Sequence, residues 1–64
     1  MTRARYLRIA EVIDKTGLSR RTIYRKMEAG TFPKTVKLSE RAVAWPEEKV
    51  EAWLENPEDW KDAA

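Results

Sequence analysis

Basic side chains are concentrated in one short stretch of this 64-residue chain, at positions 19–26. Gly17 is placed to stop one helix and Ser19 to cap the next, so Arg20 and Arg21 fall in the first turn of a helix. Cations are disfavoured there, because the macrodipole makes the N-terminal end of a helix positive. An anion supplied by a partner would bind the free N–H groups of that turn and remove the conflict. The stretch therefore predicts a contact with phosphate groups.

Two helices joined by a short turn would present this stretch. The first is predicted over 9–16, where positions of one helix face recur at i, i+3, i+4 and i+7. The second is predicted from Ser19 to about residue 29, with Ile23 and Met27 on its inward face. The outward face carries Arg21, Thr22, Arg25 and Ala29, with Lys26 at its margin. Such a pair of helices is typical of a helix-turn-helix.

The side chains of the second helix suit duplex DNA. A guanidinium group is a planar fork that reads a guanine edge bidentately, so Arg21 or Arg25 is expected to contact a base. Thr22 would contact a phosphate or a thymine methyl group. The full candidate set is Ser19, Arg20, Arg21, Thr22, Tyr24, Arg25 and Lys26. The alternative interpretation is a helix face that only solubilises the protein.

A β-hairpin is predicted after the second helix, because alternating positions at 35–38 are followed by a turn at 39–41 and a returning strand at 42–45. Val43 and Trp45 are expected to face inward. Arg41 would lie at or near the tip, flanked by Lys34 and Lys37, with the size and charge to enter a minor groove or grip its phosphates. The alternative is a hairpin that merely closes the core.

A third helix is predicted to start with Pro46 at its first position and to bury Val50, Trp53 and Leu54. One further turn is expected at 56–59. Trp60 would then fold back on the core or contact a partner.

The charges of the chain are segregated along the sequence. Residues 1–41 hold eleven bases and four acids, for a net charge of +7, whereas residues 42–64 have a net charge of −5. A polyanion would be attracted to one side of such a domain and repelled from the other. An ordinary solvated surface with segregated signs is the alternative.

Composition argues against several other functions. The chain has no cysteine and no histidine, so thiolate metal sites and the usual general base are missing, and we expect no enzyme, cofactor, metal or small-molecule substrate. No apolar run approaches the roughly 20 residues of a membrane span, and no apolar segment near the start suggests secretion. A single domain in the cytoplasm is expected.

Several motifs between about Leu7 and Leu54 together resemble the AlpA family of phage and prophage regulators. They are TGLSR at 16–20, TIYR at 22–25, GTFPK at 30–34, VKL at 36–38 and WP at 45–46, followed by Val50, Ala52, Trp53 and Leu54. The resemblance implies a mainly α fold with a small β-hairpin: a minimal winged helix-turn-helix of three helices plus a wing, similar to excisionases and MerR-type heads. It implies a domain at 7–55, a recognition helix at 19–29 and a wing at 34–45.

The remaining segments are expected to be a flexible basic arm at 1–6 and a short tail at 56–64. Arg3, Arg5 and Arg8 would extend along the DNA backbone or form a disordered basic tail.

The resemblance also implies a function: binding of double-stranded DNA to activate an integrase gene, to act as an architectural excision factor, or both. Integrase, RNA polymerase and further copies on tandem sites are the partners that this implies. A protein-interaction module or anti-repressor acting through the acidic third helix and Trp60 is the alternative. RNA binding ranks third, because the aromatic residues are expected in the core rather than on a stacking platform.

Overall fold

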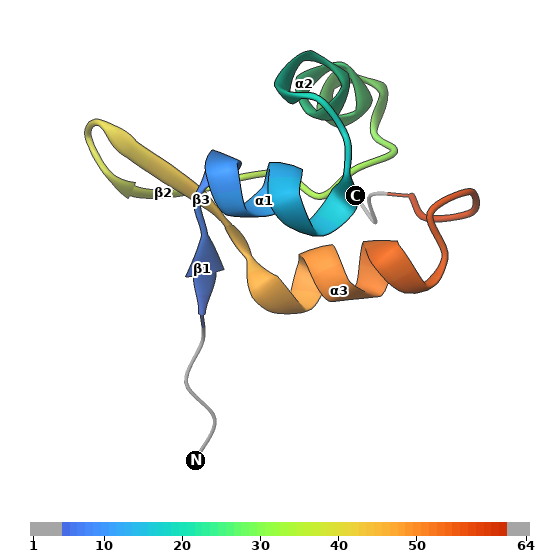
Figure 1. The fold of residues 1–64 in the computed structure, drawn as a ribbon. Coiled ribbons are helices and arrows are strands. Elements are labelled where there is room, and N and C mark those ends of the chain that lie inside the picture. Colours follow the sequence, from blue (N-terminus) through green and yellow to red (C-terminus); the bar gives the residue numbers. More distant parts are fainter. Residues whose placement is uncertain (1–4, 62–64) are drawn as a thin grey trace.

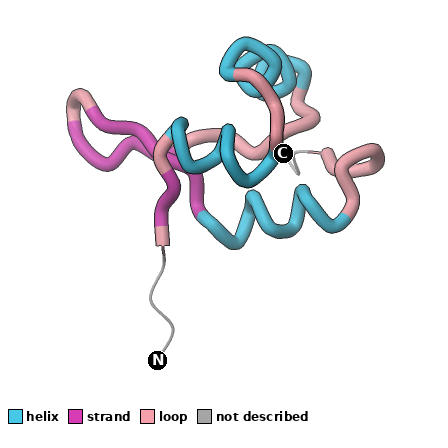
Figure 2. Tube along the Cα trace, in the orientation of Figure 1, coloured by secondary structure: helices cyan, strands magenta, loops and turns pink. Residues whose placement is uncertain are grey.

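A computed structural model describes residues 5–61 of the chain. It contains β1 (Tyr6–Leu7), α1 (Ile9–Thr16), α2 (Arg20–Ala29), β2 (Val36–Ser39), β3 (Ala42–Pro46) and α3 (Glu47–Glu55), as Figures 1 and 2 show. The strands form an antiparallel sheet in the order β1-β3-β2. The predicted helix-turn-helix with a wing is confirmed.

Both helices of the helix-turn-helix end where the sequence predicts. Gly17 adopts φ 73° and its N–H donates to the Ile13 carbonyl at 2.9 Å, which closes α1. Gly30 adopts φ 78° and closes α2 in the same way. A side chain with a Cβ atom is strained in this left-handed region, so glycine is favoured at both positions. The short turn between these helices fixes the direction of α2.

The N-terminal segment differs from the expected arm. Tyr6 and Leu7 pair with Pro46 and Trp45 of β3, and the Glu47 N–H donates to the Arg5 carbonyl at 2.8 Å. The flexible arm expected at 1–6 is therefore wrong at residues 5 and 6, while residues 1–4 lie outside the described residues. The sequence did not predict this strand because two residues are too few to show alternation. The strand forms only because β3 supplies its partner.

The start of α3 also differs by one residue. Pro46 was expected at the first helical position, but it ends β3 and caps the helix instead. Pro46 pairs with Tyr6, so the sheet extends up to the helix, and the helix begins one residue later than predicted.

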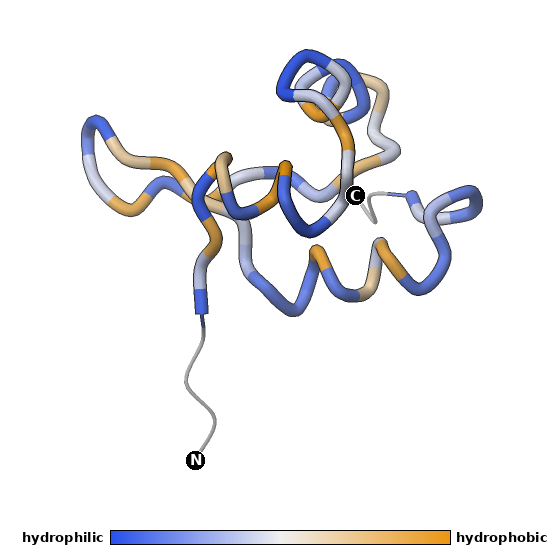
Figure 3. The backbone as a smooth tube through the Cα atoms, viewed as in Figure 1, coloured by the Kyte–Doolittle hydropathy of each residue, from blue (hydrophilic) through white to orange (hydrophobic). Residues whose placement is uncertain are grey.

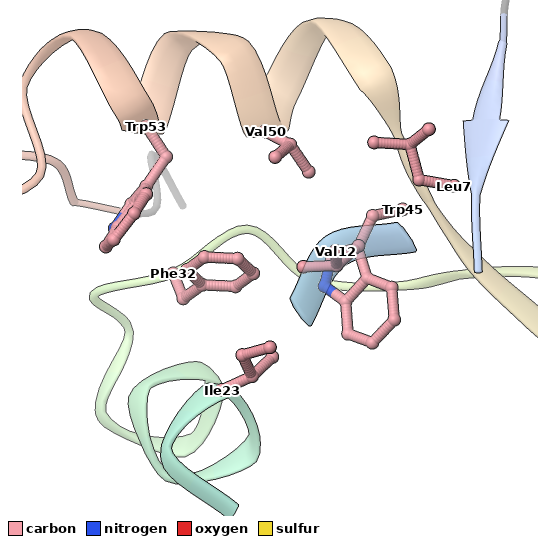
Figure 4. Packing of buried hydrophobic residues seen from close by; sticks show 7 residues of the cluster. All are labelled: Leu7, Val12, Ile23, Phe32, Trp45, Val50 and Trp53. Carbon is pink, nitrogen blue, oxygen red and sulfur yellow. The ribbon is translucent and has the colours of Figure 1, made fainter. Parts of the chain in front are cut away.

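Seven buried side chains form the core, and each helix contributes to it (Figure 4). They are Leu7, Val12, Ile23, Phe32, Trp45, Val50 and Trp53. The core lies between α2 and α3, so these two helices occupy opposite sides of the molecule (Figures 1 and 4). Leu54 and Trp60 pack against it and are partly buried, which agrees with the buried stripe predicted for the third helix and with Trp60 folding back on the core.

The hairpin of β2 and β3 extends beyond this core (Figure 1). Trp45 is buried as predicted, but Val43 on the same face is 42% exposed. The inward orientation predicted for Val43 is wrong because the hairpin extends beyond the core there, and no other segment of residues 5–61 buries this side chain. The alternation of residues along a strand predicts which face of the sheet a side chain lies on, but not how much of that side chain is buried.

Candidate nucleic-acid interface

The three arginines of α2 are exposed and have no acidic partner among residues 5–61. They are Arg20, Arg21 and Arg25. Arg5 and Lys15, by contrast, form ion pairs with acids of the chain. A helix surface with several unpaired cations attracts a polyanion.

The N-terminus of α2 offers two backbone donors. The Ser19 hydroxyl accepts from the Thr22 N–H at 3.2 Å, and the Ser19 carbonyl accepts from the Ile23 N–H. The N–H groups of Arg20 and Arg21 have no acceptor within residues 5–61. These two donors and the positive end of the macrodipole together favour an anion at this helix end.

Two of the other predicted contacts on α2, Thr22 and Lys26, are less exposed than the arginines. The Thr22 hydroxyl accepts from the Ser19 hydroxyl at 2.9 Å and is half-buried, as is Lys26. Ser19 itself is exposed. The exposed part of the predicted contact surface therefore includes all three arginines and Ser19.

Tyr24 connects α2 to the sheet. Its ring lies 6.1 Å from the Trp45 ring of β3 at an interplanar angle of 59°, while 37% of Tyr24 stays exposed. Sequence reasoning placed Tyr24 among the DNA contacts. The structure gives it a packing role as well, because this pair joins α2 to β3.

The wing cations Lys34, Lys37 and Arg41 are also exposed. Ser39 ends β2, so the turn consists of Glu40 and Arg41, with Arg41 at the tip as predicted. Lys37 is opposite Val43 in the ladder. It therefore shares a sheet face with Val43 and Trp45, the face toward which α2 packs through Tyr24. Lys34 is exposed at the start of the wing.

The N-terminal arginines are placed differently from the predicted arm. Arg5 forms ion pairs with Glu11 at 3.3 Å and with Glu47 at 3.7 Å. The Arg8 N–H donates to the Glu11 carboxylate at 3.0 Å, at the start of α1. Arg3 lies outside the described residues. Arg5 thus neutralises acids of its own chain.

The acidic part of the chain lies away from α2. Helix α3 carries its acids on the far side of the core (Figures 1 and 4). Lys15 of α1 donates a hydrogen bond to the Glu51 carboxylate, and this bond raises the pKa of Lys15 above its ordinary value. The acids of α3 therefore lie apart from the arginines of α2, whereas Arg5 and Lys15 pair with acids of α3.

Two tryptophan N–H groups, which sequence reasoning treated only as part of the core, hold the loop between α2 and the wing. The Trp45 indole donates to the Pro33 carbonyl at 2.9 Å, and the Trp53 indole donates to the Thr31 carbonyl at 2.8 Å. Phe32 between them is fully buried, with its ring 4.9 Å from that of Trp53. The signal in the sequence was the polar N–H of each indole, which needs an acceptor when buried.

Trp53→Phe tests this loop attachment. The phenyl ring would keep an aromatic contact with Phe32 but would leave the Thr31 carbonyl without its donor. We expect the free energy of unfolding to fall by about 1–3 kcal/mol. Thermal unfolding followed by circular dichroism measures this, with Lys49→Ala on the exposed side of α3 as the control. A Trp53→Phe protein as stable as the wild type would contradict the role of the indole.

Residues 5–61 form no pocket and no group of three metal-ligating side chains. None of the helices in that range is long and apolar enough to cross a bilayer.

Comparison with known proteins agrees with this geometry. The family model described as "Prophage CP4-57 regulatory protein (AlpA)" matches residues 5–57, which include every helix and strand of the structure. The chain is 44% identical over 54 residues to "Uncharacterized protein ORF88" of Enterobacteria phage P4, an alignment covering 84% of this chain and 61% of that protein. It therefore spans less than two thirds of the phage protein.

A second relative comes from Escherichia coli strain K12. The chain is 39% identical over 56 residues to "DNA-binding transcriptional activator AlpA", and the alignment covers 78% of this chain and 80% of the relative. The motifs TGLSR, TIYR and GTFPK fall within the residues that the family model matches. The resemblance found in the sequence is confirmed, and the chain belongs to the AlpA family of prophage regulatory proteins.

Proposed function

We propose that this chain is a sequence-specific, double-stranded-DNA-binding regulator of a phage or integrative element. The observation that carries the proposal is the unpaired, exposed set of arginines on α2, together with two free N–H groups at the start of that helix. The name of the relative from E. coli, a DNA-binding transcriptional activator, supports the same conclusion.

In this proposal α2, with its Ser19 cap, lies in the major groove and the wing at 34–45 meets the adjacent minor groove. Arg21 or Arg25 reads a guanine, and Arg20 with the free N–H groups binds a phosphate. Lys34, Lys37 and Arg41 contact the backbone on either side of the minor groove. The contact between Tyr24 and Trp45 holds the two elements at a fixed angle.

The biological role we propose is activation of integrase transcription, architectural assistance of excision, or both. A transcriptional role requires RNA polymerase as a partner, and an excision role requires integrase. A single module of this size buries only about 600–1,000 Å² on DNA, so we propose that several weakly associating copies occupy tandem sites.

The first experiment is a salt titration of duplex binding. Affinity for a duplex that carries the regulated region should fall steeply between low and physiological salt, because phosphate contacts release counterions. Lys49→Ala removes one positive charge from the side of the molecule opposite α2 and should leave the dependence of affinity on salt concentration unchanged. Binding that does not depend on salt concentration, or no binding to any duplex at low salt, would contradict the proposal.

Footprinting on a neighbouring integrase promoter and attachment site would separate the two roles. Protection confined to the promoter supports transcriptional control. Protection of repeated sites at the attachment junction supports excision.

The structure keeps one alternative function open, a protein-interaction module on the acidic α3. That helix faces away from α2, so it would remain accessible on DNA-bound protein (Figure 1). Trp60 is packed on the core and would contribute only its exposed part. Glu55→Lys is the suitable test, because reversal at Glu51 would also break the ion pair with Lys15. Loss of regulation with unchanged DNA affinity would support this alternative.

A substitution at the wing tip should strengthen DNA binding rather than weaken it. Glu40 lies beside Arg41 in the turn, where a phosphate would be repelled by its charge. Glu40→Gln should strengthen duplex binding by roughly 1 kcal/mol or less, which is about fivefold in affinity at most. Fluorescence anisotropy at low salt measures the change. Glu48→Gln makes the same change of charge on α3 and should have no effect; equal effects of both variants would remove the wing from the interface.

A further inference from the structure

The hairpin carries several exposed apolar side chains. Val36, Leu38 and Val43 are 38%, 46% and 42% exposed, and they make up three of the five large exposed hydrophobic residues in the described part of the chain. Figure 3 shows hydrophobic positions on both hairpin strands and a hydrophilic tip. Apolar side chains gathered on one projecting element are typical of a contact surface.

Leu38 is the most exposed of these residues, and the backbone explains its position. Lys37 pairs with Val43 and Ser39 pairs with Ala42, so β2 holds one more residue than β3 between these pairs. Leu38 is this extra residue of a β-bulge. Bulges re-aim a side chain away from the regular sheet, and they occur often next to functional sites.

The charges around this surface decide what it fits. Lys37 and Arg41 lie on either side of Leu38 in the sequence, and neither makes an ion pair within residues 5–61. A second wing would bring the same cations and be repelled. The minor groove of a DNA duplex supplies the matching chemistry, because its phosphates attract the cations and its sugars and base steps accept apolar side chains.

We propose that Leu38 is a wedge that enters between base pairs from the minor groove and kinks the duplex toward the major groove. Val36 and Val43 pack against the sugars on the two sides of the hairpin, while Lys37 and Arg41 bind the flanking phosphates. This inference rests on the proposed function and adds a deformation of DNA to it.

The place of Leu38 in the sheet agrees with such an entry. Strand β2 is an edge of the sheet, so its outer side is not covered by another strand. Leu38 precedes the turn rather than occupying it, so the edge of β2 enters the groove and Glu40 stays at its rim. The unfavourable charge of Glu40 then lowers affinity without blocking the wedge.

The test measures DNA shape separately from affinity. A duplex protected in the footprinting experiment is labelled at both ends for energy transfer, and 2-aminopurine replaces adenine at each flexible TA or CA step in turn. Saturating wild-type protein should bend the duplex by about 20–90° and raise the 2-aminopurine fluorescence at one step, because that base loses its stacking.

Leu38→Ala should lose most of the bend and the fluorescence signal while it still binds at higher protein concentration. Leu38→Phe should restore both signals, because an aromatic ring also serves as a wedge. Both variants should keep the wild-type melting temperature, since the residue is exposed and outside the core. Lys49→Ala serves as the matched control and should bend DNA like the wild type.

Three results would overturn the inference. Wild-type protein could bind the duplex without bending it, Leu38→Ala could bend it fully, or sedimentation could show that Leu38→Ala only weakens association between copies. In all three the proposed function stands, because duplex binding is retained. Failure of the wild type to bind any duplex would instead overturn the proposed function, and the wedge with it.

Discussion

Arg25→Ala should weaken specific duplex binding by about 1–3 kcal/mol, a loss of about fivefold to 150-fold in affinity. Arg25 is exposed on the outer side of α2 and has no ion pair within residues 5–61, so alanine removes no stabilising contact from the fold. The expected loss therefore belongs to binding alone. Anisotropy titrations with a specific and an unrelated duplex measure it, and thermal unfolding checks that stability is unchanged.

The pattern of loss distinguishes a base contact from a phosphate contact. An arginine that reads a guanine should lose affinity for the specific duplex and little for the unrelated one, so specificity relaxes. An arginine that binds phosphate should lose affinity for both duplexes, and the salt slope should fall by about one. We expect Arg21→Ala or Arg25→Ala to follow the first pattern and Arg20→Ala the second.

Lys49→Ala is the matched control, since it removes one positive charge from the opposite side of the molecule. If it weakened binding as much as Arg25→Ala, the protein's net charge rather than a docked helix would explain the attraction, and the proposed interface would be wrong.

Trp45→Ala should unfold much of the protein. Trp45 is 1% exposed, contacts the rings of Tyr24 and Phe32, and donates its indole N–H to the Pro33 carbonyl. Truncation of a buried tryptophan costs about 3–5 kcal/mol. A domain of this length has a total stability of only about 3–10 kcal/mol, so the variant should lose its cooperative transition or melt far below the wild type. Urea denaturation followed by circular dichroism measures the effect.

Trp45→Phe separates packing from hydrogen bonding at this position. It keeps a ring against Tyr24 and Phe32 but removes the indole N–H, so we expect a loss well below that of alanine. The loss in free energy of DNA binding should exceed the loss in free energy of unfolding, because the lost hydrogen bond to the Pro33 carbonyl no longer holds the loop that orients α2 against the wing.

A Trp45→Ala protein with wild-type stability would contradict our description of the core.

Local sequence features were enough to predict the helix-turn-helix. Gly17, Ser19 and Gly30 act on their own neighbours through left-handed backbone or a hydroxyl cap, so their effect follows from residue type. The position of Ile23 in the helical repeat of α2 likewise predicted which face of this helix would be buried. The opposite face, with Arg21 and Arg25, had to be exposed for the same reason.

Other features depended on partners far away in the chain. Tyr6 and Leu7 form a strand only because β3 lies beside them, and Arg5 meets Glu47 through the same pairing. Val43 is exposed because the hairpin extends past the core, which alternation along a strand cannot show. The bulge at Leu38 arises from the register between two strands and leaves no mark in the composition of either.

The sequence by itself thus determined the two helix ends, the buried and basic faces of α2 and the separation of charge along the chain, because each depends on residue type and short-range spacing. Only the tertiary structure decided that the acidic α3 lies across the core from the arginines of α2, that two indoles fix the loop from α2 to the wing, and that Leu38 lies in a bulge. These features are contacts between segments distant in sequence, and packing and register select them.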